Sequence, residues 1–293
     1  MSRPVRIEVE VAGHVGHVFA SRRIAHTDDA GDAADAGSRD AGAADSDVGM
    51  TGSAEPAPGP PAVVLIHGIG ASHRYLERLH RNLAATVDTF SIDLPGFGAT
   101  PEPDHTLNAA EQATYIIGAL ERLGVLDFVI VGHSMGTQFV TEVAVQQPAR
   151  VRHVVLMGPV VNDRRRTVAR QALALGRDCL FFESPSSNAV VFTDYLRCGP
   201  AWYLKNLRVM MDYRLEDRIM DVSAPVLVLR GEHDPVAPRD WCHRLMARAA
   251  AGAFLEVEGT GHVVQHNKSV EVAEAILRFA GLTEAAPAAE PVA

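Results

Sequence analysis

The feature that most constrains this chain is the alternation of short apolar runs with longer amphipathic ones. Short apolar strands that alternate with helices are typical of a mostly parallel sheet covered by helices on both faces, an α/β fold. Residues 5–24 alternate between apolar and polar side chains around a glycine-containing turn, which predicts a β-hairpin ahead of the α/β part of the chain. The predicted strands lie at 62–68, 89–93, 128–132, 151–158, 225–231 and 253–259, and the predicted helices at 73–84, 107–123, 135–147, 239–249 and 268–280.

Residues 159–222 break this alternation. They contain no strand pattern, and stretches such as RRRTVARQALALGRDCLFF predict three or four helices instead. A connection of this length exceeds a plain crossover between neighbouring strands. We therefore expect a helical cap at 159–222, lying over one edge of a core that residues 1–158 and 223–282 form.

An acidic segment at 27–60 interrupts the core. It holds eight acidic residues and one basic residue, Arg39, and so carries seven of the nine net negative charges of the chain. Its composition offers too little apolar surface to offset the entropy of ordering, which predicts a disordered loop, and the tail at 283–293 is similar. Because the remaining chain is close to neutral, a nucleic-acid partner is not indicated.

The sequence also bears on the compartment. No window approaches the roughly 18 consecutive apolar residues that a membrane helix requires, and the first residues show no export signal. The cysteines, Cys179, Cys198 and Cys242, are odd in number and lack the spacing of a metal site. We expect a cytoplasmic protein without a membrane partner, a metal or an organic cofactor. The oligomeric state is not readable from the sequence.

Ser134 lies between two glycines in the segment GHSMG, directly after the predicted strand at 128–132. A sharp strand–turn–helix connection raises a serine hydroxyl at the carboxyl edge of a sheet, and it needs glycine where side chains would meet neighbouring backbone. An ordinary helix N-cap also favours serine but does not require paired glycines. The pattern therefore favours Ser134 as a nucleophile.

A nucleophilic serine needs a base to take its proton and an acid to orient that base. Asp234 follows one predicted strand in the segment GEHDPVAP, and His262 follows the next strand in GTGHVVQ. Because parallel strands end at the same edge of a sheet, we expect both side chains to lie near Ser134. The sequence thus predicts a triad of Ser134, His262 and Asp234.

Other titratable residues lie near the same loops. Asp163, after the strand at 151–158, is an alternative acid that could reach the histidine. We interpret His67 and His133 as structural residues, and Glu232 and Asp240 as surface charges. His266 lies a helical turn beyond His262, and His233 adjoins the acid in a position that would point elsewhere.

Acyl transfer also needs two backbone N–H groups aimed at the developing oxyanion. Met135 directly follows the serine. Ile69 lies in HGIGAS, after the strand at 62–68, where glycines let the backbone approach a ligand. We expect the N–H groups of Ile69 and Met135 to form the oxyanion hole.

In chain order, the segments HGIG, DLPGFG, GHSMG, GEHDPV and GTGH resemble those of the α/β-hydrolase superfamily, over nearly the whole chain outside the acidic segment and the tail. The resemblance implies an eight-stranded, mostly parallel sheet flanked by helices, with a small helical cap after the sixth strand. It also implies that Asp93 in DLPGFG forms a turn and does not take part in the chemistry.

Branches of the superfamily differ at these segments. Ser134 argues against epoxide hydrolases and haloalkane dehalogenases, which carry aspartate at this turn, and Ala71 and Thr137 depart from the pattern of meta-cleavage C–C bond hydrolases. The resemblance therefore implies a carboxylic ester hydrolase that works through an acyl-enzyme. The alternatives are a C–C bond hydrolase, a thioesterase or lactonase, a cofactor-free perhydrolase, and a small-ligand receptor with little turnover.

Many of the aromatic side chains lie in the predicted cap. Phe181, Phe182, Tyr195 and Trp202 are candidates for an apolar substrate pocket, which would suit a small apolar or aromatic ester. For most of them, however, helical spacing favours the core of the cap itself, and both interpretations are open at this point.

Overall fold

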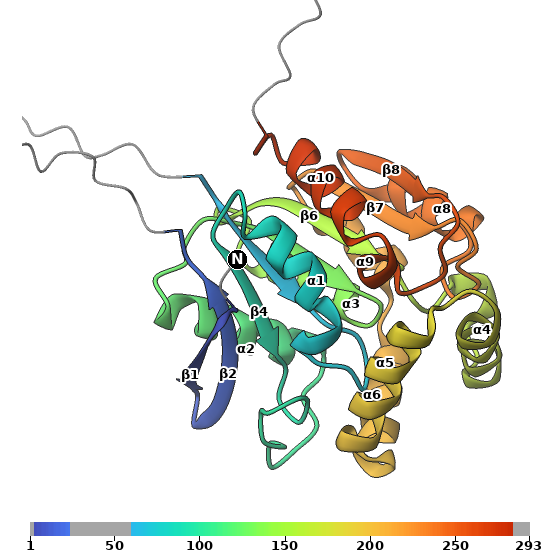
Figure 1. Ribbon diagram of the computed structural model, residues 1–293, viewed down its shortest axis with the longest axis horizontal. Coiled ribbons are helices and arrows are strands. Elements are labelled where there is room, and N and C mark those ends of the chain that lie inside the picture. The colour runs from blue at the N-terminus through green and yellow to red at the C-terminus, as the bar shows by residue number, and fades with distance from the viewer. Residues whose placement is uncertain (1–2, 24–59, 284–293) are drawn as a thin grey trace, which may run out of the picture.

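The computed structural model describes residues 3–23 and 60–283 of the chain (Figure 1). The predicted disorder of the acidic segment 27–60 and of the tail 283–293 lies outside the described residues, apart from Pro60 and Thr283. The predicted α/β fold is confirmed by the strands and helices of the described residues.

One eight-stranded sheet forms the centre of the molecule, in the order β1-β2-β4-β3-β5-β6-β7-β8. The predicted hairpin of β1 and β2 is antiparallel, β2 also pairs antiparallel with β4, and the other pairs are parallel. All the predicted strands are present, with small shifts at their ends. The strands are β1 (Val5–Val11), β2 (His14–Ser21), β3 (Ala62–Ile66), β4 (Thr89–Asp93), β5 (Phe128–His133), β6 (Val151–Met157), β7 (Val226–Gly231) and β8 (Gly252–Val257).

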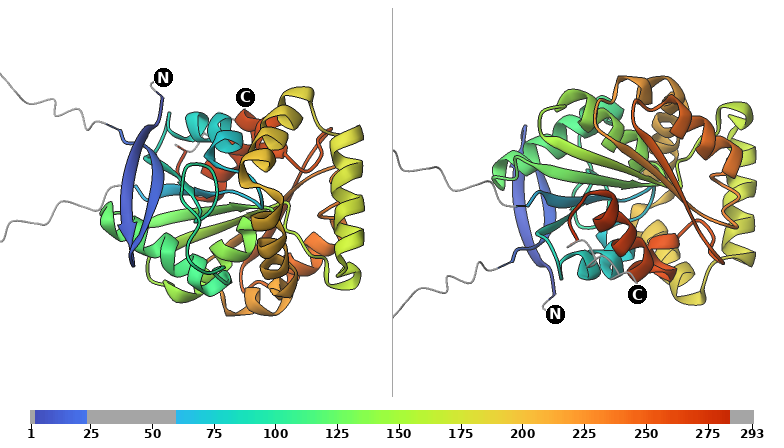
Figure 2. Two further views of the ribbon diagram at one scale, coloured as in Figure 1. Left: turned by 90° about the horizontal axis from the view of Figure 1, so that it is seen from below. Right: turned by 90° about the horizontal axis from the view of Figure 1, so that it is seen from above.

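Helices cover both faces of the sheet, which explains why its central strands are apolar throughout. In β3, Val63 and Leu65 belong to the cluster that packs against α1 and α10, whereas Val64 and Ile66 belong to the opposite cluster with α2, α3 and α8. Figure 2 shows the two helical layers on either side of the sheet. The helices are α1 (His73–Leu83), α2 (Ala109–Arg122), α3 (Gly136–Gln146), α8 (Arg239–Arg248) and α10 (Ser269–Phe279).

A helical insertion, residues 159–222, connects β6 to β7 and lies at the end of the sheet (Figures 1 and 2). A short helix that the sequence did not predict, α9 (Val264–Asn267), follows β8. The helices of the insertion are α4 (Val168–Phe181), α5 (Pro185–Cys198), α6 (Pro200–Asp212) and α7 (Leu215–Arg218).

Candidate active site

Ser134 occupies the turn between β5 and α3 and has a left-handed backbone, with a φ of 56°. This conformation is costly for a residue with a Cβ, so the surrounding structure has to hold it. A Cβ on Gly132 would lie 2.4 Å from the carbonyl oxygen of Gly136, and a Cβ on Gly136 would lie 2.6 Å from the carbonyl oxygen of His67. Both glycines are therefore required by the close approach of neighbouring backbone.

We expect Gly136→Ala to lower the free energy of unfolding by about 1–3 kcal/mol, because the added methyl group would push against the backbone of Ile66 and His67. Gly176→Ala is the matched control. Apart from its chain neighbours and the backbone of α4 itself, no atom of the described residues lies within 4 Å of a Cβ at this position, and alanine there should raise the free energy of unfolding by about 0.5–1 kcal/mol. Urea denaturation followed by circular dichroism measures both values, and equal stability of the two variants would contradict the steric explanation.

The structure joins His262 to Asp234, as the sequence predicts. Nδ1 of His262 lies 2.8 Å from Oδ2 of Asp234. The other carboxylate oxygen accepts the N–H groups of Val236 and Ala237 at 2.8 and 3.0 Å, so the turn after β7 fixes the orientation of the carboxylate. Because a carboxylate oxygen can only accept, Nδ1 carries a proton, and once the imidazole is neutral Nε2 is left to act as a base.

Burial and charge act in opposite directions on this pair. Burial tends to lower the pKa of His262, but the carboxylates of Asp234, Asp178 and Glu183 outweigh it and raise the pKa to about 9. Burial likewise tends to raise the pKa of Asp234. The imidazole and the N–H groups of its turn prevail, however, and hold this pKa below its ordinary value. The pair thus favours a carboxylate next to a strongly basic imidazole.

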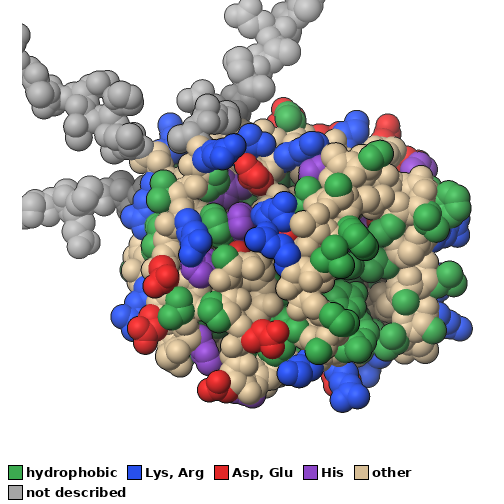
Figure 3. All heavy atoms as spheres, turned by 60° about the horizontal axis from the view of Figure 1, so that its bottom comes forward, with side chains coloured by type: hydrophobic (Ala, Val, Ile, Leu, Met, Phe, Trp, Pro, Cys, Tyr) green, Lys and Arg blue, Asp and Glu red, His purple; other side chains and the backbone are tan. Residues whose placement is uncertain are grey.

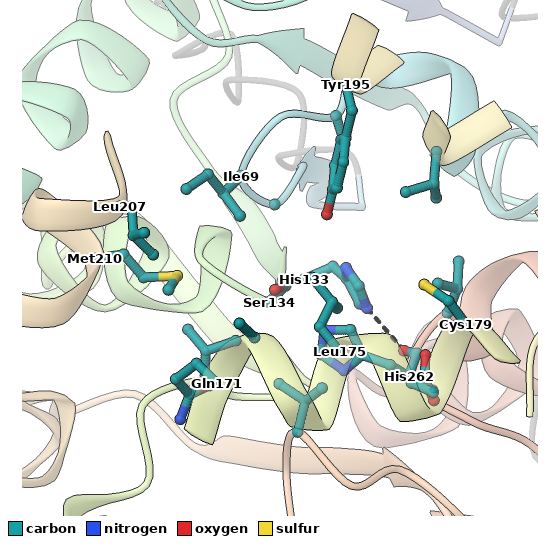
Figure 4. A pocket seen from close by; sticks show the side chains of 18 of the residues that line it. Ile69, His133, Ser134, Gln171, Leu175, Cys179, Tyr195, Leu207, Met210 and His262 are labelled. Atoms are coloured by element: carbon teal, nitrogen blue, oxygen red, sulfur yellow. Dashed lines mark hydrogen bonds between the residues drawn. The ribbon is translucent and has the colours of Figure 1, made fainter. Parts of the chain in front are cut away.

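Ser134 and His262 line the same cavity (Figure 4). Nε2 of His262 is buried and has no hydrogen-bond partner within the described part of the chain, so it makes no hydrogen bond to the Ser134 hydroxyl here. Hydrogen bonds of this kind are often long in a ligand-free site and tighten when a substrate binds. The structure therefore places the predicted serine and histidine in the same cavity, without a hydrogen bond between their side chains.

The two predicted oxyanion donors flank Ser134. A Cβ on Gly68 would lie 2.8 Å from the Cβ of Ser134, which shows how closely the loop that holds Ile69 approaches the serine. Across the described residues, the N–H groups of Ile69 and Met135 donate to no acceptor. Both groups are therefore available to a ligand oxygen placed beside Ser134.

His133 connects the loop of Ile69 to the loop of His262. The N–H of Gly68 donates to the hydroxyl of Tyr75 at 2.6 Å, and this hydroxyl lies 2.7 Å from Nδ1 of His133. Nε2 of His133 lies 2.9 Å from the carbonyl oxygen of His262 and donates to it. Burial lowers the pKa of His133 to about 3, so the ring is neutral. The sequence predicted a structural position for His133 but carried no signal for Tyr75.

The alternative residues lie elsewhere. Asp163 pairs with Arg244, whose Nη2 is 2.6 Å from its Oδ1. His67 accepts the N–H of Leu94 at 3.0 Å and supports the turn after β3. Nε2 of His266 lies 3.1 Å from the hydroxyl of Ser186, on the insertion. None of these side chains makes a hydrogen bond to the side chain of His262 or Asp234 within the residues that the structure describes.

A cavity of about 110 Å³ lies between the sheet edge and the insertion. Tyr195, one of the predicted pocket residues, lines it and points toward Ser134 in Figure 4. Helical spacing does not reveal which face of a helix turns inward, so the sequence carries no signal for several other lining residues of the insertion. They include Gln171, Leu175, Asp178, Cys179 and Leu207.

The prediction is wrong for the other three aromatic residues, which do not line this cavity. Phe181 is 73% exposed, like several other large hydrophobic side chains of the insertion. Figure 3 shows hydrophobic side chains gathered on one face of the molecule. The ring of Phe182 packs near that of His233, with centroids 5.4 Å apart. Trp202 is buried against Gly96, where the absence of a side chain makes room for the indole.

A family model described as "Alpha/beta hydrolase family" matches residues 63–275. The chain belongs to the alpha/beta hydrolase family. Its sequence is 36% identical over 248 residues to a Bacillus subtilis protein called uncharacterized hydrolase YugF, with 76% of this chain and 90% of that protein covered. It is also 25% identical over 223 residues to a pimeloyl-(acyl-carrier protein) methyl ester esterase of Nitrosomonas europaea, with 66% and 86% covered.

A solved structure similar to this alpha/beta hydrolase is the enol-lactonase from Burkholderia xenovorans LB400. The TM-score is 0.71 at 16% sequence identity, with 93% of this chain and 99% of that chain covered, so the likeness shows the shared fold. The family and these relatives support a hydrolase activity. No helix among the described residues is both long enough and apolar enough to cross a bilayer.

Proposed function

We propose that this alpha/beta hydrolase cleaves a carboxylic ester of a small, apolar or aromatic substrate through an acyl-enzyme on Ser134. One observation carries the proposal. The pair of His262 and Asp234, 2.8 Å apart, leaves Nε2 without a partner among the described residues, in the cavity that the left-handed Ser134 also lines. This is the arrangement that a serine needs in order to lose its proton during attack.

In the proposed mechanism, Ser134 attacks the ester carbonyl carbon while Nε2 of His262 takes the hydroxyl proton. Asp234 keeps the proton on Nδ1 and stabilises the imidazolium. The N–H groups of Ile69 and Met135 hold the oxyanion, and the imidazolium then gives its proton to the departing alkoxide. Water repeats the sequence on the acyl-enzyme. Acid–base catalysis of this kind contributes about 10²–10⁴-fold to the rate, and each oxyanion donor about 10²–10³-fold.

The size of the cavity supports a small substrate. Its volume of about 110 Å³ is somewhat less than the roughly 150 Å³ of an engineered apolar cavity that holds benzene. A cavity of this size favours a short acyl chain beside Ser134. The cytoplasmic location, the lack of a membrane or nucleic-acid partner and the independence from a cofactor stay predictions from the sequence.

A panel of p-nitrophenyl esters of increasing chain length tests the proposal. We expect the acetate and butyrate to be hydrolysed with kcat/KM at least about tenfold above that of the dodecanoate, because a long chain exceeds the cavity. A meta-cleavage dienone serves as the competing substrate. Dienone turnover that greatly exceeds ester turnover would assign C–C bond hydrolysis to the site. Ligand binding by the parent protein without hydrolysis of either class would favour a receptor.

A further inference from the structure

The last turn of α4 and the residues that follow it in the insertion contact the loop of His262. Oδ1 of Asp178 accepts the backbone N–H of His262 at 2.8 Å, and Oε1 of Glu183 accepts that of Val263 at 2.6 Å. Asp178 is completely buried. The insertion thus supplies the hydrogen-bond acceptors for the backbone at and after the proposed base.

Gly261 makes this contact possible. A Cβ at this position would lie 2.4 Å from Oδ1 of Asp178 and 2.9 Å from Oε1 of Glu183. The glycine directly before His262 therefore leaves the space that the two carboxylates occupy.

The second carboxylate oxygen of Asp178 indicates that the contact is also electrostatic. Oδ2 is buried and has no hydrogen-bond partner among the described residues. A buried carboxylate with an unpaired oxygen is unfavourable unless a positive charge lies nearby. Burial raises the pKa of Asp178 to about 7, and the charge of His262 opposes this rise. A protonated His262 is thus a favourable neighbour for an ionised Asp178.

Four groups act on the imidazole from the elements packed around it. Asp234, after β7, binds Nδ1 directly, and Asp178 and Glu183 add negative charge from the insertion. His133, at the end of β5, lies with its ring centroid 4.7 Å from that of His262 and is neutral. Because the turn after β7 fixes Asp234, the carboxylates of Asp178 and Glu183 act on the charge of His262 independently of it.

We propose that Asp178 is a positioning residue, which holds His262 through its backbone N–H and favours the protonated imidazole, so that the helical insertion sets the pH range in which Ser134 is activated. The inference rests on the proposed function, because it assigns the base of that same site. It predicts that the activity of the parent protein rises with pH as His262 loses its proton, with a midpoint above the ordinary pKa of a histidine.

The substitution Asp178→Asn separates charge from structure, since the asparagine oxygen can still accept the N–H of His262. We would measure the rate at which a fluorophosphonate labels Ser134 between pH 5 and 10.5, which requires no knowledge of the natural substrate. Removing the negative charge should move the midpoint of the pH profile about one unit lower. Asp178→Ala should shift it likewise and also slow labelling at the plateau by about 10-fold to 100-fold, because the histidine loses its anchor.

Glu183→Gln is the matched control, since it removes the same charge from a group with a smaller influence on His262. It should shift the midpoint less than Asp178→Asn does. An unchanged midpoint of the pH profile in Asp178→Asn would overturn the inference. If Asp178→Asn and Asp178→Ala also slowed labelling equally, the contact would be purely structural.

A second readout keeps this inference separate from the proposed function. Imidazole NMR titration, with the signal of His262 assigned by its loss in His262→Gln, gives the midpoint without any reaction. A lower midpoint in Asp178→Asn supports the inference even if the parent is never labelled at Ser134, a result that would overturn the proposed serine mechanism. An equal midpoint in the two proteins overturns the inference whatever the activity.

Discussion

Replacing Ser134 by alanine should reduce kcat/KM for p-nitrophenyl acetate by about 10⁶-fold, the loss expected when the nucleophile of a triad is removed. In the proposed mechanism the hydroxyl oxygen attacks the ester, and alanine would leave only the binding site and the proposed oxyanion donors. The fold should survive, because the Ser134 side chain makes no hydrogen bond within the described part of the chain. Steady-state hydrolysis measures the loss, and peptide mapping after fluorophosphonate labelling identifies the reacting residue.

The chain offers a matched control for this variant. The hydroxyl of Ser186 lies 3.1 Å from Nε2 of His266, a closer serine–histidine contact than the structure shows at Ser134. Nδ1 of His266 has no hydrogen-bond partner in the described residues, so no acid orients this second histidine. Ser186→Ala should therefore retain activity within about threefold. Labelling of Ser186, or a Ser134→Ala protein that still turns over, would refute the site assignment.

Replacing Asp234 by asparagine should lower kcat/KM by about 10⁴-fold with little change in structure. The amide can donate to Nδ1 of His262, which would place the ring proton on Nε2 and leave no base for Ser134. The two N–H groups that hold Oδ1 keep an acceptor in the asparagine oxygen. The measurement is the pH profile of ester hydrolysis, compared with the profile of the parent.

Asp163→Asn is the corresponding control, because Asp163 is the other acid that follows a strand at this edge. Its carboxylate binds Arg244 and not the histidine. We expect less than a tenfold loss, arising from the contact between the insertion and α8. A larger loss in Asp163→Asn than in Asp234→Asn would reverse the choice of acid.

The parts of the site that depend on chain order were predictable from the sequence. The glycines around Ser134 predict a turn in which Cβ atoms would collide with neighbouring backbone. The structure shows that backbone atoms lie this close to Gly132 and Gly136. Asp234 and His262 follow consecutive parallel strands, so the geometry of the sheet alone brings them to one edge. Local sterics and strand direction were sufficient to place these residues.

The parts that depend on how a helix is rotated were not predictable. Phe181 and Asp178 lie on the same helix, yet the aromatic residue faces solvent and the acidic one is buried beside His262. Hydrophobic periodicity favours the opposite arrangement, because a lone buried carboxylate is unfavourable without its partners. For Trp202, the relevant signal in the sequence was Gly96 of DLPGFG, because the indole occupies the space that a side chain at Gly96 would take. The sequence alone does not show that these two residues are in contact, so the signal could not be used.

The bonds between the insertion and the loop of His262 limit how this enzyme can be re-engineered. Beyond the two carboxylates, the hydroxyl of Ser184 donates to the side chain of Asn267 at 2.8 Å, so this corner is attached at several points. A chimera that exchanges residues 159–222 for the corresponding segment of a relative would also remove the contacts that hold the backbone of His262, the proposed proton acceptor. Transplants should therefore begin after Ser187, where the substrate-facing helices can change while the histidine keeps its scaffold.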